Sequence, residues 1–242
     1  MGIPVGESGA VELPTDGNAA VTPRRASRAS RAAVLCTAVC LIVLALLGAG
    51  VRSSFGPQLR LDAAVSEALY AGDHRAAALD ELLTVLTAPG LSWVRFVVFL
   101  PVLAWLVRRR LWWTAAWVVT AVVLVAPLTT ALKEYFGRIR PPFVEGGARL
   151  ESLSFPSGHS SGITTLVAVA LILAWPLLGT RRARLGALCA GAGLVLLVGL
   201  TRMWLGVHFL SDVVGGWAFG LAWTLGTALL FGALPGGRAA LR

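Results

Sequence analysis

The chain has 242 residues, of which 57% are hydrophobic and only 14% carry a charged side chain. Soluble domains average about 45–50% apolar and about 25% charged residues, so the composition excludes an ordinary soluble protein and indicates a single integral membrane domain. The formal net charge of +9 is also typical of nucleic-acid-binding proteins. Here, however, arginines flank apolar segments, so we attribute the charge to membrane topology and expect no nucleic-acid partner.

Residues 1–32 are polar and rich in Gly, Pro, Ser and Ala, a composition typical of disorder, and we expect a disordered cytoplasmic tail there. Six apolar segments follow, each near the roughly 20 residues that a helix needs to cross a bilayer. They are 33–51, 91–107, 111–132, 158–178, 185–201 and 212–232. The sequence therefore predicts an all-α fold, an integral membrane bundle of six transmembrane helices over 33–235, with a short cytoplasmic tail at 236–242.

The segment 52–90 differs from the six apolar segments, because acidic residues are interspersed among leucines at helical spacing. This pattern predicts two short amphipathic helices that lie at the membrane interface rather than crossing it. Pro89 and Gly90 predict a turn at the end of the segment. Arg95, near the outer end of the second apolar segment, is expected to extend its side chain outward to water, and we assign it no role.

The distribution of charge predicts the orientation in the membrane. If the N-terminus is cytoplasmic, six spans place both termini and the basic breaks at 108–110 and 181–184 on one side. That side carries twelve arginines and three acidic residues, whereas the other side carries nine cations and nine acidic residues. Because positively charged loops stay in the cytoplasm, we expect a multi-pass plasma-membrane protein with both termini cytoplasmic. Three polar clusters then fall on the extracytoplasmic face.

The last of these clusters contains Arg202, His208 and Asp212. His208 and Asp212 are four residues apart and so share one face of a helix. A carboxylate beside an imidazole fixes its tautomer and stabilises its protonated form, which leaves the other ring nitrogen as an oriented nucleophile or base. The planar guanidinium of Arg202 suits a pair of phosphate oxygens.

The first two clusters provide further groups for an anion. Pro156 is expected in the first turn of a helix, with Ser154 as a plausible cap. The residues 157–159 then present backbone N–H groups at a helix N-terminus, which is an anion site, and His159 can donate a proton to a leaving oxygen. Lys133 and Arg140 supply two cations that can neutralise the charge of a phosphoryl group.

Taken together, the clusters resemble the signature of the type 2 phosphatidic acid phosphatases, a family grouped with the lipid phosphate phosphatases and the vanadium haloperoxidases. All ten signature residues are present in order: Lys133, Arg140 and Pro141, then Pro156, Ser157, Gly158 and His159, then Arg202, His208 and Asp212. Thr201 stands where the family usually has Ser, which keeps a hydroxyl. The resemblance covers about 120–225, and the six-span layout extends it to most of the chain.

The resemblance implies that His208 is the nucleophile, forms a phosphohistidine and is oriented by Asp212. It implies that His159 protonates the leaving group and then activates water. The residues expected to bind the substrate phosphate are Lys133, Arg140, Ser157, Gly158 and Arg202. The family needs no metal for this chemistry, so we expect neither a metal nor another cofactor. Arg138 lies outside the signature; it would contact either a second phosphate or only a lipid headgroup.

These expectations describe a bacterial membrane phosphatase that removes the terminal phosphate of a lipid phosphate or pyrophosphate at the outer leaflet. Undecaprenyl diphosphate is the first candidate substrate, from family analogy and from a composition typical of a GC-rich genome. Phosphatidic acid and phosphatidylglycerol phosphate are the alternatives. A lipid phosphotransferase would use the same histidine, and a non-enzymatic transporter or assembly factor would be expected to lack an intact signature. The sequence does not indicate the oligomeric state.

Overall fold

The computed structural model describes residues 23–241, which form helices joined by loops and contain no β-strand. The α-helices are α1 (Pro23–Arg52), α2 (Gly56–Leu69), α3 (Ala77–Thr87), α4 (Ser92–Arg108), α5 (Trp112–Phe136), α6 (Gly158–Ala174), α7 (Arg181–Trp204) and α8 (Leu210–Phe231). Three short 3₁₀ helices are η1 (Ala88–Gly90), η2 (Gly147–Arg149) and η3 (Trp175–Leu177). The all-α prediction is confirmed.

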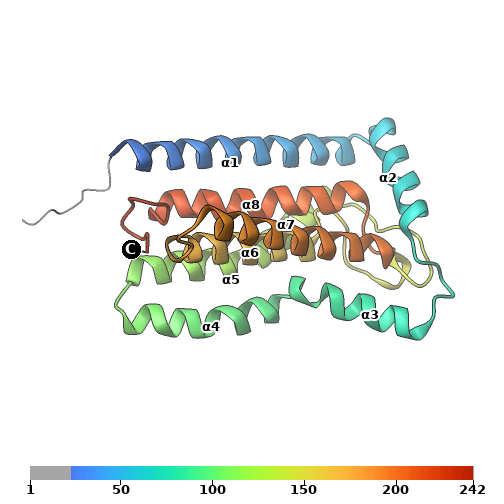
Figure 1. The fold of residues 1–242 in the computed structure, drawn as a ribbon. Helices are drawn as coiled ribbons and strands as arrows, with labels where there is room; N and C mark the ends of the chain where they lie inside the picture. The colour runs from blue at the N-terminus through green and yellow to red at the C-terminus, as the bar shows by residue number, and fades with distance from the viewer. Residues whose placement is uncertain (1–22, 242) are drawn as a thin grey trace, which may run out of the picture.

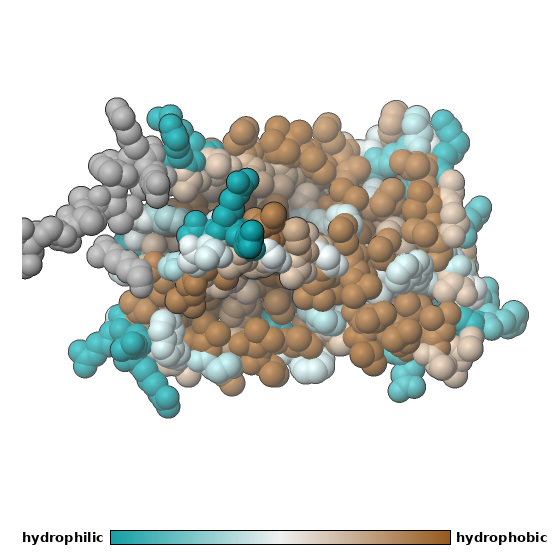
Figure 2. Space-filling view, viewed as in Figure 1, coloured by the Kyte–Doolittle hydropathy of each residue, from teal (hydrophilic) through white to brown (hydrophobic). Residues whose placement is uncertain are grey.

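Membrane-spanning helices make up most of this bundle. Among the described residues, five helices are long and apolar enough to cross a membrane: α1, α5, α6 extended by η3, α7 and α8. The pair α3 and α4 passes the same test as a sixth span, with a bend of 46° at the break between them. Apolar side chains cover most of the middle of the face in Figure 2, and hydrophilic ones gather toward its two ends. The prediction of a six-span bundle agrees with this layout.

The helix α8 lies inside the bundle, where it packs against α1, α5 and α6. The helix α2 crosses the end of the bundle opposite the C-terminus (Figure 1). The long loop between α5 and α6 and the short connection between α7 and α8 lie at this same end. All three sequence clusters therefore lie at one end of the molecule, as predicted.

Two glycines allow α6 and α8 to approach closely. A Cβ atom added to Gly216 would lie 2.6 Å from the carbonyl oxygen of Ser157, and one added to Gly220 would lie 2.5 Å from that of Ser161. Any side chain at these positions would push the two backbones apart, because real Cβ contacts are longer. This contact places the first turn of α8 beside the first turn of α6.

The first helix begins earlier than predicted. We expected disorder through residue 32, but α1 starts at Pro23, so this boundary is wrong by ten residues. Proline is favoured at the first position of a helix, and the alanines and arginines that follow are strong helix formers. The rest of the predicted tail, residues 1–22, lies outside the described residues.

We predicted that α3 lies at the membrane interface, and the structure adds a contact with protein. The helix runs alongside α7 and leads through η1 into α4 (Figure 1). Protein covers only the part of its apolar surface where Leu83 packs with Leu205 and Val207. Three other apolar side chains of the helix are exposed, those of Leu79, Leu82 and Val85. An amphipathic pattern is the same whether the apolar face meets lipid or protein, so the sequence did not separate the two cases.

Residues 236–241 fold back onto the bundle rather than extending away as a tail. The hydroxyl of Thr114 donates to the carbonyl of Ala239 at 2.8 Å, and Ala239 is buried. The guanidinium of Arg238 lies 3.8 Å from the ring centroid of Trp113. These contacts close the end of the bundle that is opposite the three clusters.

Candidate functional site

His208 and Asp212 meet where the connection after α7 enters α8. Nδ1 of His208 lies 3.3 Å from Oδ2 of Asp212, and both side chains are almost fully buried. The same carboxylate oxygen accepts the backbone N–H of Phe209 at 2.9 Å and the hydroxyl of Ser154. A carboxylate at the third position of a helix satisfies a free N–H there. Asp212 therefore caps α8 while it holds the imidazole.

The other imidazole nitrogen faces a guanidinium. Nε2 of His208 lies 3.1 Å from Nη1 of Arg140, and this Nη1 also donates to the carbonyl of Val207 at 2.7 Å. Because a guanidinium can only donate, the contact requires an unprotonated Nε2. The ring proton then sits on Nδ1, toward Asp212. This tautomer leaves the lone pair of Nε2 as the reactive one.

We expect His208 to stay neutral far into the acid range. Burial and the nearby positive charges, chiefly those of Arg140 and Arg202, lower the pKa of His208 well below its usual value of 6.5. The chain contains only three histidines, so selective ¹⁵N labelling gives a simple spectrum. The resonance that disappears in His208→Gln should keep the shifts of a neutral ring from pH 8 to about pH 5.5. Protonation of that resonance near pH 6.5 would contradict this environment for His208.

Neutral oxygen atoms hold the two cations of the first cluster. Nζ of Lys133 donates to the carbonyl of Leu153 at 2.6 Å. Nε of Arg140 donates to the carbonyl of Ser152 at 2.7 Å, and Nη2 donates to its hydroxyl at 3.0 Å. None of these partners carries a charge, so both positive charges remain available to an anion.

Arg202 is the third cation of the site. Its Nη1 donates to the hydroxyl of Thr87 at 3.3 Å, and its buried Nε has no hydrogen-bond partner in the part of the chain that the structure describes. Its charge interacts with those of Lys133 and Arg140. Within the described residues, none of the three cations forms an ion pair with a carboxylate. Unpaired buried cations are costly, so this concentration of charge indicates an anionic ligand.

The Pro-Ser-Gly-His turn leads into α6, whose N-cap lies three residues later than the predicted cap, Ser154. Ser157 is the N-cap, because its hydroxyl accepts the N–H of Ser160 at 3.4 Å. The suggested cap, Ser154, instead donates its hydroxyl to Asp212. The backbone N–H of Ser157 donates to the carbonyl of Asp212 at 2.8 Å, which ties α6 to α8. Only the hydroxyl proton of Ser157 is left for a substrate oxygen.

The next two backbone N–H groups, those of Gly158 and His159, make no hydrogen bond to any described residue. They lie in the first turn of α6, where free N–H groups and the helix dipole favour an anion. A Cβ atom added to Gly158 would meet only Thr129, at 3.9 Å. The space on the Cβ side of Gly158 is therefore open except for this contact with Thr129.

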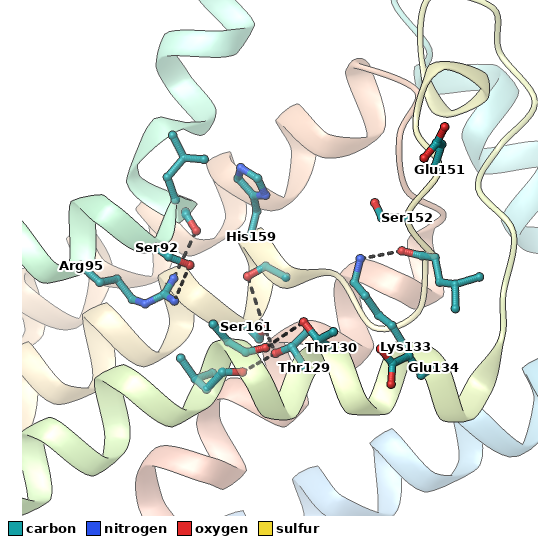
Figure 3. Close-up of a pocket in the computed structure, with 16 residues that line it drawn as sticks. Ser92, Arg95, Thr129, Thr130, Lys133, Glu134, Glu151, Ser152, His159 and Ser161 are labelled. Carbon is teal, nitrogen blue, oxygen red and sulfur yellow. Dashed lines mark hydrogen bonds between the residues drawn. The ribbon is translucent and has the colours of Figure 1, made fainter.

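His159 is placed differently from His208. Its side chain makes no hydrogen bond to a described residue, and it lines a cavity of about 450 Å³ together with Lys133 (Figure 3). The backbone of Gly90 lies against it, since a Cβ atom added there would come within 2.9 Å of the His159 ring. His208 does not line this cavity. The two imidazoles therefore lie in different surroundings, one enclosed among protein groups and the other at the cavity wall.

Arg138 supports the site from behind. Its Nη1 donates to Oδ1 of Asp212 at 2.8 Å and to the hydroxyl of Ser211 at 2.6 Å. Its Nη2 donates to Oδ2 of Asp62 at 2.6 Å, and its guanidinium lies 4.1 Å from the ring centroid of Phe209. Both alternatives left open for Arg138, a second phosphate and a lipid headgroup, are wrong, because two buried carboxylates already occupy this guanidinium.

The structure thus brings together every residue that the signature predicted, and it adds Asp62, Arg138 and Ser154. Arg138 had a weak signal in the sequence, its position two residues before Arg140. Asp62 had none, since it lies on α2, which we expected at the interface. The described residues contain no group of three His, Cys, Asp or Glu side chains that could hold a metal ion. The expectation that no metal or cofactor is needed stays a prediction.

Comparison with known proteins agrees with this geometry. Residues 110–234 match the model of the PAP2 superfamily. Phosphatidylglycerophosphatase B of Bacillus subtilis is 38% identical over 97 residues, which are 39% of this chain and 46% of that protein. Lipid A 1-phosphatase of Rhizobium etli is 35% identical over 131 residues, which are 49% of this chain and 51% of that protein. The chain thus spans about half the length of the curated relatives it matches.

A solved structure extends the likeness beyond the signature region. The crystal structure of the transmembrane PAP2-type phosphatidylglycerolphosphate phosphatase from Bacillus subtilis superposes with a TM-score of 0.67 at 26% sequence identity. The superposition covers 79% of this chain and 93% of that structure. The match to the family model covers just over half of the chain and contains all three clusters. The chain therefore belongs to the PAP2 superfamily.

Proposed function

We propose that the protein is a membrane phosphatase that hydrolyses a terminal phosphate of a lipid through a phosphohistidine intermediate. The observation that carries this proposal is the contact between Nε2 of His208 and Arg140, 3.1 Å apart. In this contact, the unprotonated Nε2 is available as a nucleophile, and the guanidinium of Arg140 beside it can bind the phosphoryl group. Asp212 on Nδ1 stabilises the positive charge that develops on the ring.

The proposed reaction has two steps. First, Nε2 of His208 attacks the phosphorus atom, the bond from phosphorus to the leaving oxygen breaks, and protonated His159 gives its proton to that oxygen. Second, His159 takes a proton from water, whose oxygen attacks the phosphorus and breaks its bond to Nε2. Inorganic phosphate leaves, and His208 is neutral again. Lys133, Arg140 and Arg202 neutralise the charge on the phosphoryl oxygens in both steps.

We also propose that the site faces the extracytoplasmic side of the membrane. The support is the distribution of charge, since the basic breaks at 108–110 and 181–184 lie at the end of the bundle opposite the site. Positively charged loops favour the cytoplasm. At the outer end of a six-helix bundle, a phosphate headgroup reaches the site while its hydrocarbon tails stay in the bilayer.

For the substrate, undecaprenyl diphosphate is our first candidate, and phosphatidylglycerol phosphate has equal support from the relative named phosphatidylglycerophosphatase B. Phosphatidic acid is the third candidate. In each of them, the phosphate to be removed is terminal and lies at headgroup depth. This choice of substrates rests on the family and on the chemistry of the site.

The test is phosphate release by the purified protein in detergent from these three lipids, without added metal. We expect release from at least one lipid. A correctly folded protein that releases phosphate from none of them would contradict the proposal. Products are analysed with a lipid alcohol present, because a phosphorylated acceptor in place of inorganic phosphate would identify a phosphotransferase.

A further inference from the structure

Arg95 is a buried cation that the proposed reaction does not use. It lies in the first turn of α4 with 1% of its surface exposed, so the expectation that it extends outward to water is wrong. Its Nη1 donates to the carbonyl of Gly90 at 3.3 Å, and its Nη2 donates to the hydroxyl of Ser92 at 3.0 Å. Within the described residues its Nε has no partner and no carboxylate pairs with it.

The two hydrogen bonds do not account for this charge. Arginine has five N–H donors, and the contacts to Gly90 and Ser92 use two of them. Both partners are neutral, so they leave the charge uncompensated, and a buried charge without a counter-ion is costly. If Arg95 only closed the break between η1 and α4, a neutral donor would serve at lower cost. The charge therefore points to an anion that is bound during function.

The position of Arg95 shows where such an anion would lie. Arg95 and His159 line the same cavity, and Figure 3 shows Arg95 on the side of His159 that is opposite Lys133. The guanidinium reaches the backbone of α6 at Gly162, where an added Cβ atom would be 2.1 Å from Nη1. Gly162 follows His159 by three residues, about one turn or 5 Å along the helix. The guanidinium of Arg95 thus lies about one helical turn from His159, in the direction of the C-terminal end of α6.

We propose that Arg95 binds a second phosphate, carried by the part of the lipid that leaves. This inference rests on the proposed function, because it takes His159 as the boundary between the transferred phosphoryl group and the leaving group. A lipid diphosphate carries its second phosphate directly on the leaving oxygen. Phosphatidylglycerol phosphate carries it beyond a three-carbon glycerol unit. Phosphatidic acid has no second phosphate, so Arg95 makes the site selective against it.

Selectivity is the property to measure. The values of kcat/KM are compared for a lipid diphosphate, phosphatidylglycerol phosphate and phosphatidic acid, with the wild-type protein and Arg95→Gln. Loss of a hydrogen bond to a charged group predicts a fall of about ten- to a hundredfold for the substrate whose second phosphate reaches Arg95. The expected fall for phosphatidic acid is less than about threefold. The lipid, of the first two, whose kcat/KM falls in Arg95→Gln identifies the distance between the two phosphates that the site accepts.

Two variants serve as controls. Arg95→Lys keeps the charge and should recover part of the selectivity, which a purely structural role would not predict. Arg60→Gln removes an exposed arginine of α2 and should leave the ratios of kcat/KM unchanged, since it affects only the general attraction of anionic lipids. The proposal would be overturned if kcat/KM in Arg95→Gln fell equally for all three lipids, or fell for none of them.

A binding measurement tests Arg95 independently of turnover. In a His208→Gln background, which cannot hydrolyse the probe, the bisphosphate with the spacing that the kinetic comparison identifies should raise the melting temperature more than orthophosphate at equal concentration. Both probes are measured, inorganic pyrophosphate for the diphosphate spacing and glycerol bisphosphate for the glycerol spacing. Adding Arg95→Gln should remove this difference while orthophosphate still stabilises. If the difference persists, Arg95 does not bind a second phosphate, even if the protein is a phosphatase. If Arg95→Gln removes the difference but the wild-type protein hydrolyses no lipid, the proposed function fails and the anion site remains.

Discussion

Replacing His208 by glutamine should reduce lipid phosphate hydrolysis by about 10⁵-fold or more, because removal of a catalytic nucleophile has effects of this size. Glutamine keeps an amide that can accept from Arg140 and donate to Asp212, so the fold should be retained. With ³²P-labelled lipid, the wild-type protein should form a phosphoenzyme that is labile in acid and stable in base, as expected for a phosphorus–nitrogen bond. His208→Gln should form none.

A comparison with His159→Ala separates the roles of the two histidines. General acid catalysis contributes about 10²- to 10⁴-fold when the leaving oxygen needs a proton. p-Nitrophenyl phosphate has a leaving group that departs without a proton, so His159→Ala should lose much less activity on it than on the lipid. His208→Gln should be inactive on both substrates. Equal losses in His159→Ala on the two substrates, or a phosphoenzyme in His208→Gln, would contradict the proposed assignment of roles.

Replacing Arg138 by methionine should produce the largest loss of stability. Arg138 is buried between the carboxylates of Asp62 and Asp212, and its removal leaves both without a cation. Breaking a buried ion pair by deleting one partner costs about 3–5 kcal/mol. We expect the free energy of unfolding in detergent to fall by that amount. Hydrolysis should fall with it, because Asp212 then no longer holds the imidazole.

The double variant Asp62→Asn with Arg138→Met tests the pairing directly. It removes one of the two uncompensated carboxylates, so it should be more stable than the sum of the single changes predicts, by about 0.5–3 kcal/mol. The matched control is Arg149→Gln, which breaks the exposed pair of Arg149 with Glu145 and should cost about 1 kcal/mol or less. Strict additivity of the Asp62 and Arg138 changes would show that the pair contributes no coupling.

Hydropathy alone was enough to predict the membrane-spanning architecture, because the bilayer requires long apolar helices. The residues of the signature could be predicted to converge because charge placed all three clusters on one face. The contact of α3 with α7 could not be predicted, because lipid and protein satisfy the same apolar face.

The residues that were missed depend on partners in other parts of the chain. Asp62 is an unremarkable acid in an amphipathic helix until Arg138, 76 residues away, is beside it. Arg95 is expected to extend to water at a helix end, and only its neighbours in α6 show that it is enclosed. Similarly, a Ser such as Ser154 fits both a helix cap and a hydroxyl that holds a carboxylate. Contacts between distant segments cannot be read from local spacing.

The close approach of α6 and α8 fixes the distance between the two histidines through main-chain atoms. The N–H of Ser157 meets the carbonyl of Asp212 at 2.8 Å, and Gly216 allows that contact. Because this contact is between backbones, we expect side-chain substitutions elsewhere in the bundle to leave this spacing unaltered. On the proposed function, substitutions in the cavity wall formed by α4 and the 151–153 loop should change the preference for a lipid, while the reacting groups keep their separation. A protein engineer seeking a new headgroup preference should begin at that wall.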